Sequence, residues 1–284
     1  MLSRFRHPTI VTALYYLAAA PLSAQAPDVA RERAAYIAWL ETAPNSPLKA
    51  LAQQPLGSGL TLGPEDADIP LLGLPKHRLI AKENSVILQG LGDDTQVVRR
   101  ERPFRISGYT LYVTASARGK MVTVFGNSTR KRPPGYYEYD SSLVFTGRLV
   151  PPTQRSSSRV LTSDGIETQA IEAGTIVASI GTPVKLRVLR IPGASGEESE
   201  LEIFFQDESN GEGTYPAGRF VNLTPVGRGE YRLDFNRARN PFCAYNSVYP
   251  CPVPWRGNLI RAPVRAGERY RGGGLDVVPT SKTR

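Results

Sequence analysis

The apolar residues of this chain come in many short runs that are separated by turn-forming residues. Segments such as SVILQGL, KMVTVFG, VKLRVLRI and LEIFF are rich in Val, Ile, Leu and aromatic residues, and Gly, Pro, Asp or Asn lies at or soon after the end of each. The 284 residues include 26 Gly and 24 Pro. Short β-branched and aromatic runs between turn residues are typical of strands. The pattern therefore predicts an all-β protein, mainly antiparallel.

Breaks in this pattern divide the chain into segments. One segment, residues 28–42, has a helical pattern, with Asp28 as a possible cap and Pro44 as a stop. The regular spacing of six short runs predicts a β-sandwich over 55–127. We further expect a linker over 128–142, a second β-rich domain, sandwich- or barrel-like, over 143–271, and a flexible polar tail over 272–284.

The first 24 residues have the three parts of a secretory signal peptide. Arg4 and Arg6 form a basic start, TIVTALYYLAAAPL supplies an apolar stretch, and LSAQA offers cleavage after Ala24 or Ala26. The alternative is an uncleaved anchor, but the apolar stretch is short for a membrane span. We expect export to the periplasm or the extracellular space, with no membrane-spanning segment in the mature protein.

The net charge of +9 raises the question of a nucleic-acid partner. Cleavage of the signal peptide would remove two arginines, and the remaining Lys and Arg residues are scattered, apart from small clusters such as RKR at 130–132. No DNA- or RNA-binding motif accompanies them. We therefore expect no nucleic acid, and expect a small molecule or a component of the cell envelope as the partner.

Cys243 and Cys251 are the only two cysteines. In an oxidising compartment a disulfide between them is the first expectation, with free structural thiols as the alternative. A thiolate nucleophile would need a base nearby, and His77 is distant in sequence. Two cysteines alone do not make a zinc site, so no metal is predicted.

Polar residues concentrate in the last third of the chain, at the ends of predicted strands. They could line a binding pocket at one rim of a sheet, or form a polar network that only holds the loops together. For catalysis, Asp234 and Glu268 could act as an acid/base pair. No spacing names a cofactor. The residues predicted to bind a ligand are Asp207, Thr214, Tyr215, Arg219, Asn236, Asn240 and Asn258.

Two neighbouring stretches, IFFQDESNGEGTYPAGRFVNL and YRLDFNRARNPFCAYNSVYPCPVPWRGNLIRAPVRAGERY, resemble a bacterial and archaeal domain family of unknown function. That family carries F-x-D, T-Y-x-x-G-R, D-F-N-R-A-Y-N-P-x-C-A-Y, C-P-x-P, a following Asn and a late A-G-E. The resemblance implies a fold class and no particular reaction. The positions of this chain that match the family pattern are Asp207, Thr214, Tyr215, Gly218, Arg219, Asp234, Asn236, Asn240, Pro241, Cys243, Cys251, Pro252, Asn258, Gly267 and Glu268.

Two positions depart from the family pattern. Arg239 stands where the family usually has Tyr, and Glu208-Ser209 replaces a short residue and Thr. The stretch LGSGLTLGPEDADIPLLGLPKHRL also resembles a forkhead-associated sandwich. Pro64 stands where a phosphothreonine reader of that kind needs Arg, so the likeness implies architecture and not phosphopeptide binding.

Three functions remain open on these observations. The first is a binding module for a small anionic or carbohydrate ligand, in which Arg219 pairs with the anionic group and Tyr215 or Trp255 stacks on a ring. The second is a hydrolase that uses Asp234 and Glu268. The third is a structural protein of the cell envelope.

Overall fold

The computed structural model describes residues 26–271, apart from 84, 91–93, 128–131, 194–197, 254 and 256. The predicted signal peptide and the predicted tail both lie outside these residues. Within the part described, no helix is long and apolar enough to cross a membrane.

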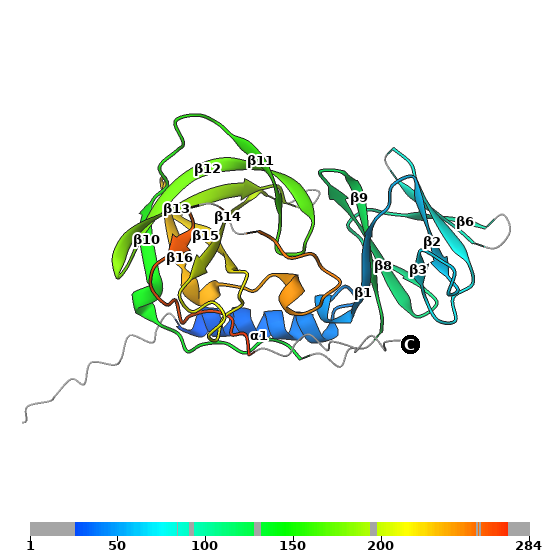
Figure 1. The fold of residues 1–284 in the computed structure, drawn as a ribbon, viewed down its shortest axis with the longest axis horizontal. Coiled ribbons are helices and arrows are strands. Elements are labelled where there is room, and N and C mark those ends of the chain that lie inside the picture. Colours follow the sequence, from blue (N-terminus) through cyan, green and yellow to red (C-terminus); the bar gives the residue numbers. More distant parts are fainter. Residues whose placement is uncertain are drawn as a thin grey trace, which may run out of the picture.

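The described part of the chain begins with helix α1, Ala26–Thr42, which starts two residues before the predicted boundary. Figure 1 shows α1 lying along the C-terminal domain. Leu40 of the helix is completely buried and packs with Leu48, Ala244 and Tyr245. A short 3-10 helix, Pro47–Lys49, then leads into the first strand. The helix is therefore held by residues that lie about 200 positions later in the sequence.

The N-terminal β domain consists of two sheets packed face to face. One sheet has the strand order β1-β9-β8-β7 and the other has the order β3-β2-β4-β5-β6. Leucine and valine side chains from both sheets form a common core, as alternating inward-facing residues predict. The strands are β1 (Ala50–Pro55), β2 (Gly59–Gly63), β3 (Ile69–Pro70), β4 (His77–Ala81), β5 (Val86–Gln89), β6 (Thr95–Val98), β7 (Phe104–Ile106), β8 (Tyr109–Ser116) and β9 (Gly119–Phe125).

The C-terminal domain is one long curled sheet with the order β10-β16-β15-β14-β13-β12-β11, to which β17 adds beside β14. Adjacent strands in this order are all antiparallel, whereas β17 runs parallel to β14. The strands are β10 (Val144–Arg148), β11 (Ser157–Leu161), β12 (Glu167–Ile180), β13 (Thr182–Ile191), β14 (Glu200–Asp207), β15 (Arg219–Gly227), β16 (Glu230–Asp234) and β17 (Leu259–Ile260). Three 3-10 helices, Ser141–Leu143, Phe235–Arg237 and Phe242–Ala244, lie between strands.

The prediction of a mainly antiparallel all-β fold with one N-terminal helix is confirmed. The C-terminal sheet curls far enough for Val150, just after β10, to bridge to Thr175 in β12 through two hydrogen bonds of 2.8 and 2.9 Å. It does not close into a barrel in the part of the chain that the structure describes, because β10 and β11 are the two ends of the strand order.

Strand β14 is buried on both of its faces. Leu201, Ile203 and Phe205 belong to the main core inside the curled sheet. On the alternate face, Phe204 packs with Phe220 and Trp255 in a second, smaller core. Glu202 shares that alternate face, so this carboxyl group is carried into the interior by the strand.

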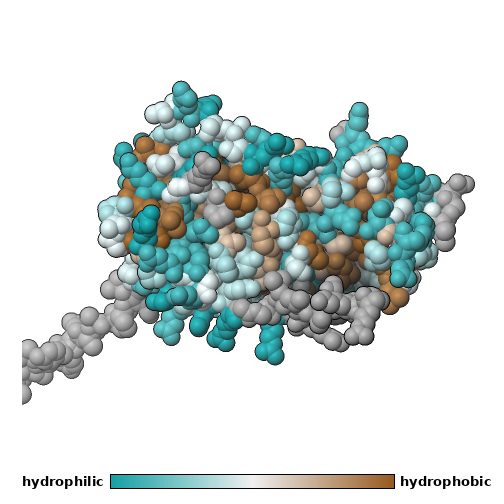
Figure 2. Space-filling view, viewed as in Figure 1, coloured by the Kyte–Doolittle hydropathy of each residue, from teal (hydrophilic) through white to brown (hydrophobic). Residues whose placement is uncertain are grey.

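Hydrogen bonds join the two β domains along the turn between β11 and β12. The Nε2 atom of Gln53 donates to the carbonyl of Asp164 at 3.2 Å, and the amide of Ala117 donates to the carbonyl of Glu167 at 2.7 Å. Arg118 also pairs with the carboxylate of Glu167. In the view of Figure 2, hydrophobic side chains reach the surface near the middle of the molecule, where the two domains meet.

We expect Leu79→Ala to lower the free energy of unfolding by about 2–5 kcal/mol, because Leu79 is completely buried in the sandwich core. Leu72→Ala is the matched control: Leu72 is 95% exposed, so the same substitution should change the free energy by less than about 0.5 kcal/mol. Denaturant unfolding of the three proteins measures both effects. Equal losses would contradict this placement of the core.

Candidate functional site

Asp207 ends β14 and is the acceptor of a buried hydrogen-bond network. Its Oδ1 atom accepts from the backbone amides of Ser209 at 2.8 Å and of Val264 at 3.0 Å, and from the hydroxyl of Ser209. Ser209, which is part of a departure from the family pattern, thus caps the carboxylate directly. The turn after β14 and the segment around Val264 are held to the same side chain.

Arg219 begins β15 and has no exposed surface. One of its terminal nitrogens donates to Asp207 Oδ2 at 2.8 Å and to the carbonyl of Val264 at 2.7 Å, and the other donates to the carbonyl of Ala266. Burial lowers the pKa of Arg219, and the carboxylate of Asp207 partly offsets this. With these donors bound inside the protein, the contacts of Arg219 favour a structural role over pairing with an anionic ligand.

Glycine directly precedes both of the buried charged residues Arg219 and Glu268. Gly218 has a φ angle of 103°, and a Cβ atom there would lie 2.5 Å from the carbonyl oxygen of Phe205. Gly267 has a φ of 73°, and a Cβ there would lie 2.5 Å from the carbonyl oxygen of Ala238. Both positions require the close backbone approach that glycine alone permits without strain.

The predicted amide and hydroxyl residues bond mainly to the backbone or to one another. Asn236 exchanges two hydrogen bonds of 2.8 Å with the backbone of Asp140. Asn258 accepts from the amide of Arg187 at 2.7 Å and donates to the carbonyl of Phe204 at 3.0 Å. Thr214 is completely buried, and its hydroxyl lies 2.9 Å from that of Ser209. These residues close loops onto the sheet, as the structural alternative describes.

Asp234 and Glu268 belong to separate hydrogen-bond networks. Asp234 Oδ1 accepts from the amide of Asn236 at 3.0 Å, and its Oδ2 lies 3.3 Å from Nε of Arg237. Glu268 accepts from other partners, described next. Among the contacts described, none joins the two carboxyl groups, so their assignment as an acid/base pair stays a prediction.

Glu268 is completely buried and surrounded by hydroxyl and amide donors. Its Oε2 accepts from the hydroxyl of Tyr245 and from the amide of Asn240 at 2.8 Å, and its Oε1 from the hydroxyl of Tyr136 at 3.4 Å. Burial raises the pKa of Glu268 to about 7, although these donors and Arg239 act in the opposite direction. Glu268 is therefore a carboxyl group that changes its charge near neutral pH.

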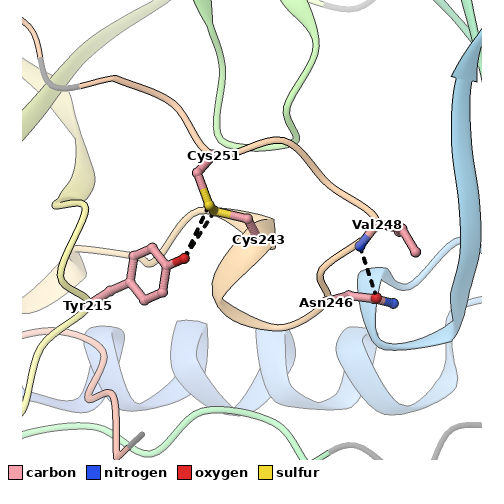
Figure 3. Close-up of a disulfide and its surroundings, with 5 residues drawn as sticks. All are labelled: Tyr215, Cys243, Asn246, Val248 and Cys251. Atoms are coloured by element: carbon pink, nitrogen blue, oxygen red, sulfur yellow. Dashed lines mark hydrogen bonds between the residues drawn. A yellow bond between two sulfur atoms is a disulfide. The ribbon is translucent and has the colours of Figure 1, made fainter. Parts of the chain in front are cut away.

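Cys243 and Cys251 form the predicted disulfide, with their Cα atoms 5.5 Å apart. Figure 3 shows the hydroxyl of Tyr215 pointing at both sulfur atoms, at 3.3 Å from Cys243 and 3.2 Å from Cys251. The ring of Tyr215 also packs edge-on against Tyr270. Trp255 lies in the small core with Phe204 and is 7% exposed. Trp255 is thus packed inside a core, whereas Tyr215 is partly exposed, and its stacking on a ligand stays a prediction.

A cleft that was not predicted runs along the C-terminal sheet, facing the sandwich in one part and helix α1 in the other. It consists of two adjoining cavities of about 430 and 880 Å³. The first is bounded on the sandwich side by β1, β8 and β9, and the second extends over β15 towards Asn240. Both are lined by Trp39, Ser163, Glu200, Glu202 and Phe242.

Within the part of the chain that the structure describes, three buried oxygen atoms of the lining have no hydrogen-bond donor: Gln53 Oε1, Glu202 Oε2 and Asn240 Oδ1. A fourth unpartnered atom, Nε of Arg237, lies 3.3 Å from the carboxylate of Asp234. A buried acceptor without a donor is costly, so each such atom in a native protein calls for a partner. All three oxygens call for a donor.

Glu202 is a buried carboxyl group of the cleft lining with a strongly raised pKa. The side chain is buried, and its pKa is raised to about 8, first by burial and then by the neighbouring carboxylates of Glu200 and Asp164. Burial also raises the pKa of Asp164. Clefts that hold carboxyl groups with raised pKa values are frequent functional sites.

Sequence reasoning missed Glu202, Glu200, Trp39, Phe242 and Gln53. One signal was available: ELEIFF places a glutamate in the middle of a strand whose neighbours on both sides are apolar. A charged residue within an apolar run that is typical of a buried strand indicates either an edge strand or a functional site. The other four residues come from elements far apart in sequence, and no local pattern joins them.

Arg219→Ala should lower the free energy of unfolding by about 3–5 kcal/mol, because it leaves the buried carboxylate of Asp207 without its cation. Arg148→Ala is the control: the Arg148 side chain is 79% exposed and lies 3.9 Å from Glu230, so its loss should cost less than about 1 kcal/mol. Urea unfolding compares the two variants. Equal stability of both would exclude the structural role of Arg219.

The raised pKa of Glu268 makes stability depend on pH. Between pH 4.5, the ordinary pKa of a glutamate, and about pH 7, the folded protein keeps a proton on Glu268 that the unfolded chain has lost. The stability that this proton adds is therefore fully present below pH 4.5 and is lost as the pH rises through about 7. Glu268→Gln, which stays neutral, should remove this loss, on the order of 3 kcal/mol between pH 5 and pH 8.

Urea unfolding at several pH values measures this effect. Glu212→Gln, at an exposed position, is the control and should keep the wild-type pH profile. If the profile of Glu268→Gln runs parallel to that of the wild type, Glu268 does not titrate near neutral pH in the folded protein.

Comparison with known proteins adds a family likeness. Residues 134–269, which include Asp207, Arg219, Glu268 and both cysteines, match the family model described as "Protein of unknown function (DUF1684)". No curated protein matches the chain. Among solved structures, the chain is similar to an uncharacterized protein of Haloarcula marismortui determined by solution NMR, with 29% identity and a TM-score of 0.41; the match covers 48% of this chain and 75% of that one.

Proposed function

We propose that this protein is an exported binding module for a small carbohydrate ligand, which it holds in the cleft between its two β domains. The observation that carries the proposal is the set of three buried, unpartnered acceptor oxygens beside aromatic side chains. Gln53, Glu202 and Asn240 supply the oxygens, and Trp39 and Phe242 line both cavities.

A carbohydrate fits this chemistry on two counts. Its hydroxyl groups can donate to the unpartnered oxygens, which removes the cost of burying them. Its C–H faces can pack on the aromatic rings of Trp39 and Phe242, since ligand sites combine apolar walls with a few placed polar groups. An anionic ligand is disfavoured, because its charge would lie among acidic side chains, of which Glu200 lines both cavities.

The proposed location follows from the N-terminal sequence. The signal-peptide pattern of residues 1–24 predicts export, and the disulfide between Cys243 and Cys251 is of the kind that persists in an oxidising compartment. A periplasmic or extracellular binding module would meet saccharides of the cell envelope, which are therefore the first ligands to test.

The test is a thermal-shift screen of the mature protein with neutral, amino and acidic monosaccharides and with cell-wall fragments. A ligand at 100 times its Kd should add about 2.7 kcal/mol to the free energy of unfolding, which raises the Tm measurably. Trp39→Ala should weaken binding at least about 10-fold, and Trp39→Phe, which keeps an aromatic face, should retain most of it.

Two results would contradict the proposal. One is that no saccharide raises the Tm at millimolar concentration. The other is that a saccharide binds equally well to the wild type and to Trp39→Ala, which would place its site elsewhere. Circular dichroism and the Tm without ligand control for the fold of both variants.

A further inference from the structure

We infer that the ligand is an amino sugar whose protonated amine pairs with Glu202. The inference rests on the proposed function, and it narrows the ligand from carbohydrates in general to those that carry a positive charge. Its basis is the position of one buried carboxyl group and the partners of the groups around it.

Glu202 is placed by β14 so that it lines both cavities while the residue is only 7% exposed. Across the sheet it lies opposite Leu189 on one side and Asn222 on the other. Leu189 offers no donor, and the amide of Asn222 donates instead to Glu200 at 2.6 Å. The cross-strand neighbours therefore leave Glu202 Oε2 without a donor.

Among the described residues, the charged groups around the cleft also leave Glu202 without a cation. The two arginines of the lining have other partners: Arg237 lies 3.0 Å from Glu32 and 3.3 Å from Asp234, and Arg239 lies 4.3 Å from the ring centre of Tyr36. Neither is among the groups that shift the pKa of Glu202. The acidic residues of the described lining are Glu32, Glu101, Asp164, Glu200 and Glu202, so acids outnumber arginines.

An ammonium group fits this position better than a hydroxyl or a metal ion. A hydroxyl can donate to Glu202, but it does not balance the charge that the buried carboxylate acquires on ionisation, whereas a cation does. A divalent metal would require several ligands close together, and the described residues contain no group of three or more His, Cys, Asp or Glu arranged to hold one. The aromatic walls and the oxygens of Gln53 and Asn240 remain available for the sugar ring.

The inference predicts a proton release. Because the pKa of Glu202 is raised to about 8 in the free protein, this carboxyl group is largely protonated at pH 6.5. Pairing with an ammonium favours the carboxylate, so binding should expel about one proton from Glu202. The facing groups that could add to the pH dependence are Glu32, Glu101, Asp164, Glu200, Arg237 and Arg239.

Isothermal titration calorimetry with glucosamine, glucose and N-acetylglucosamine tests the inference at pH 6.5. The three probes share the sugar ring and differ in one substituent, of which only the amine of glucosamine is charged. We expect glucosamine to bind at least about 10-fold more tightly than either neutral sugar. Titrations in two buffers with different ionisation enthalpies should show the release of about one proton for glucosamine only.

The variant Glu202→Gln should abolish both the preference for glucosamine over glucose and the proton release. Glu212→Gln, exposed and outside the cleft, is the matched control and should keep both. The wild-type comparison of the three sugars needs no variant, so it tests the inference even if Glu202→Gln fails to fold.

The outcomes separate this inference from the proposed function. Equal affinity for glucose and glucosamine, or a preference that survives in Glu202→Gln, overturns the inference; if Trp39→Ala then still abolishes binding, the proposed function stands. Binding of none of the three sugars counts against the amino-sugar inference, and the wider saccharide screen then decides the proposed function.

Discussion

The buried pair of Asp207 and Arg219 is the interaction on which the C-terminal domain depends. It joins the end of β14 to the start of β15, and through Val264 and Ala266 it fastens the last described segment of the chain across the sheet. A buried ion pair is favourable only when further hydrogen bonds satisfy it, and both partners here have them. The segment that carries Glu268 follows directly, so the position of that carboxyl group depends on the same pair.

This arrangement gives most of the polar residues near the C-terminus a structural use. Asn236, Asn258 and Thr214 satisfy backbone groups or neighbouring hydroxyls, and Gly218 and Gly267 permit the close backbone approaches that set Arg219 and Glu268 in place. Groups whose hydrogen bonds are made inside the protein have little left for a ligand. The oxygens without donors lie elsewhere, in the cleft.

The cleft exists because separate parts of the chain are docked together. Trp39 comes from the helix, Gln53 from the sandwich, Glu202 from β14 and Phe242 from the loop that carries the disulfide. The bond from Gln53 to the Asp164 carbonyl and the contacts of Glu167 fix the two β domains at this junction. Any change that separates the domains would therefore also take the proposed ligand site apart.

The sequence by itself determined the fold class and the helix near 28–42, because strand period, turn residues and helix stops are local properties. It also determined the pairing of the cysteines, because the chain has only two. It also marked the polar residues after β14 and β16 as special, but a pattern cannot tell a satisfied hydrogen bond from an unsatisfied one. Only the tertiary structure decided that Arg219 donates its hydrogen bonds to Asp207 and to backbone carbonyls, while Glu202 Oε2 lacks a donor. Both outcomes depend on which groups from distant segments come within hydrogen-bond distance, and long-range packing alone sets those distances.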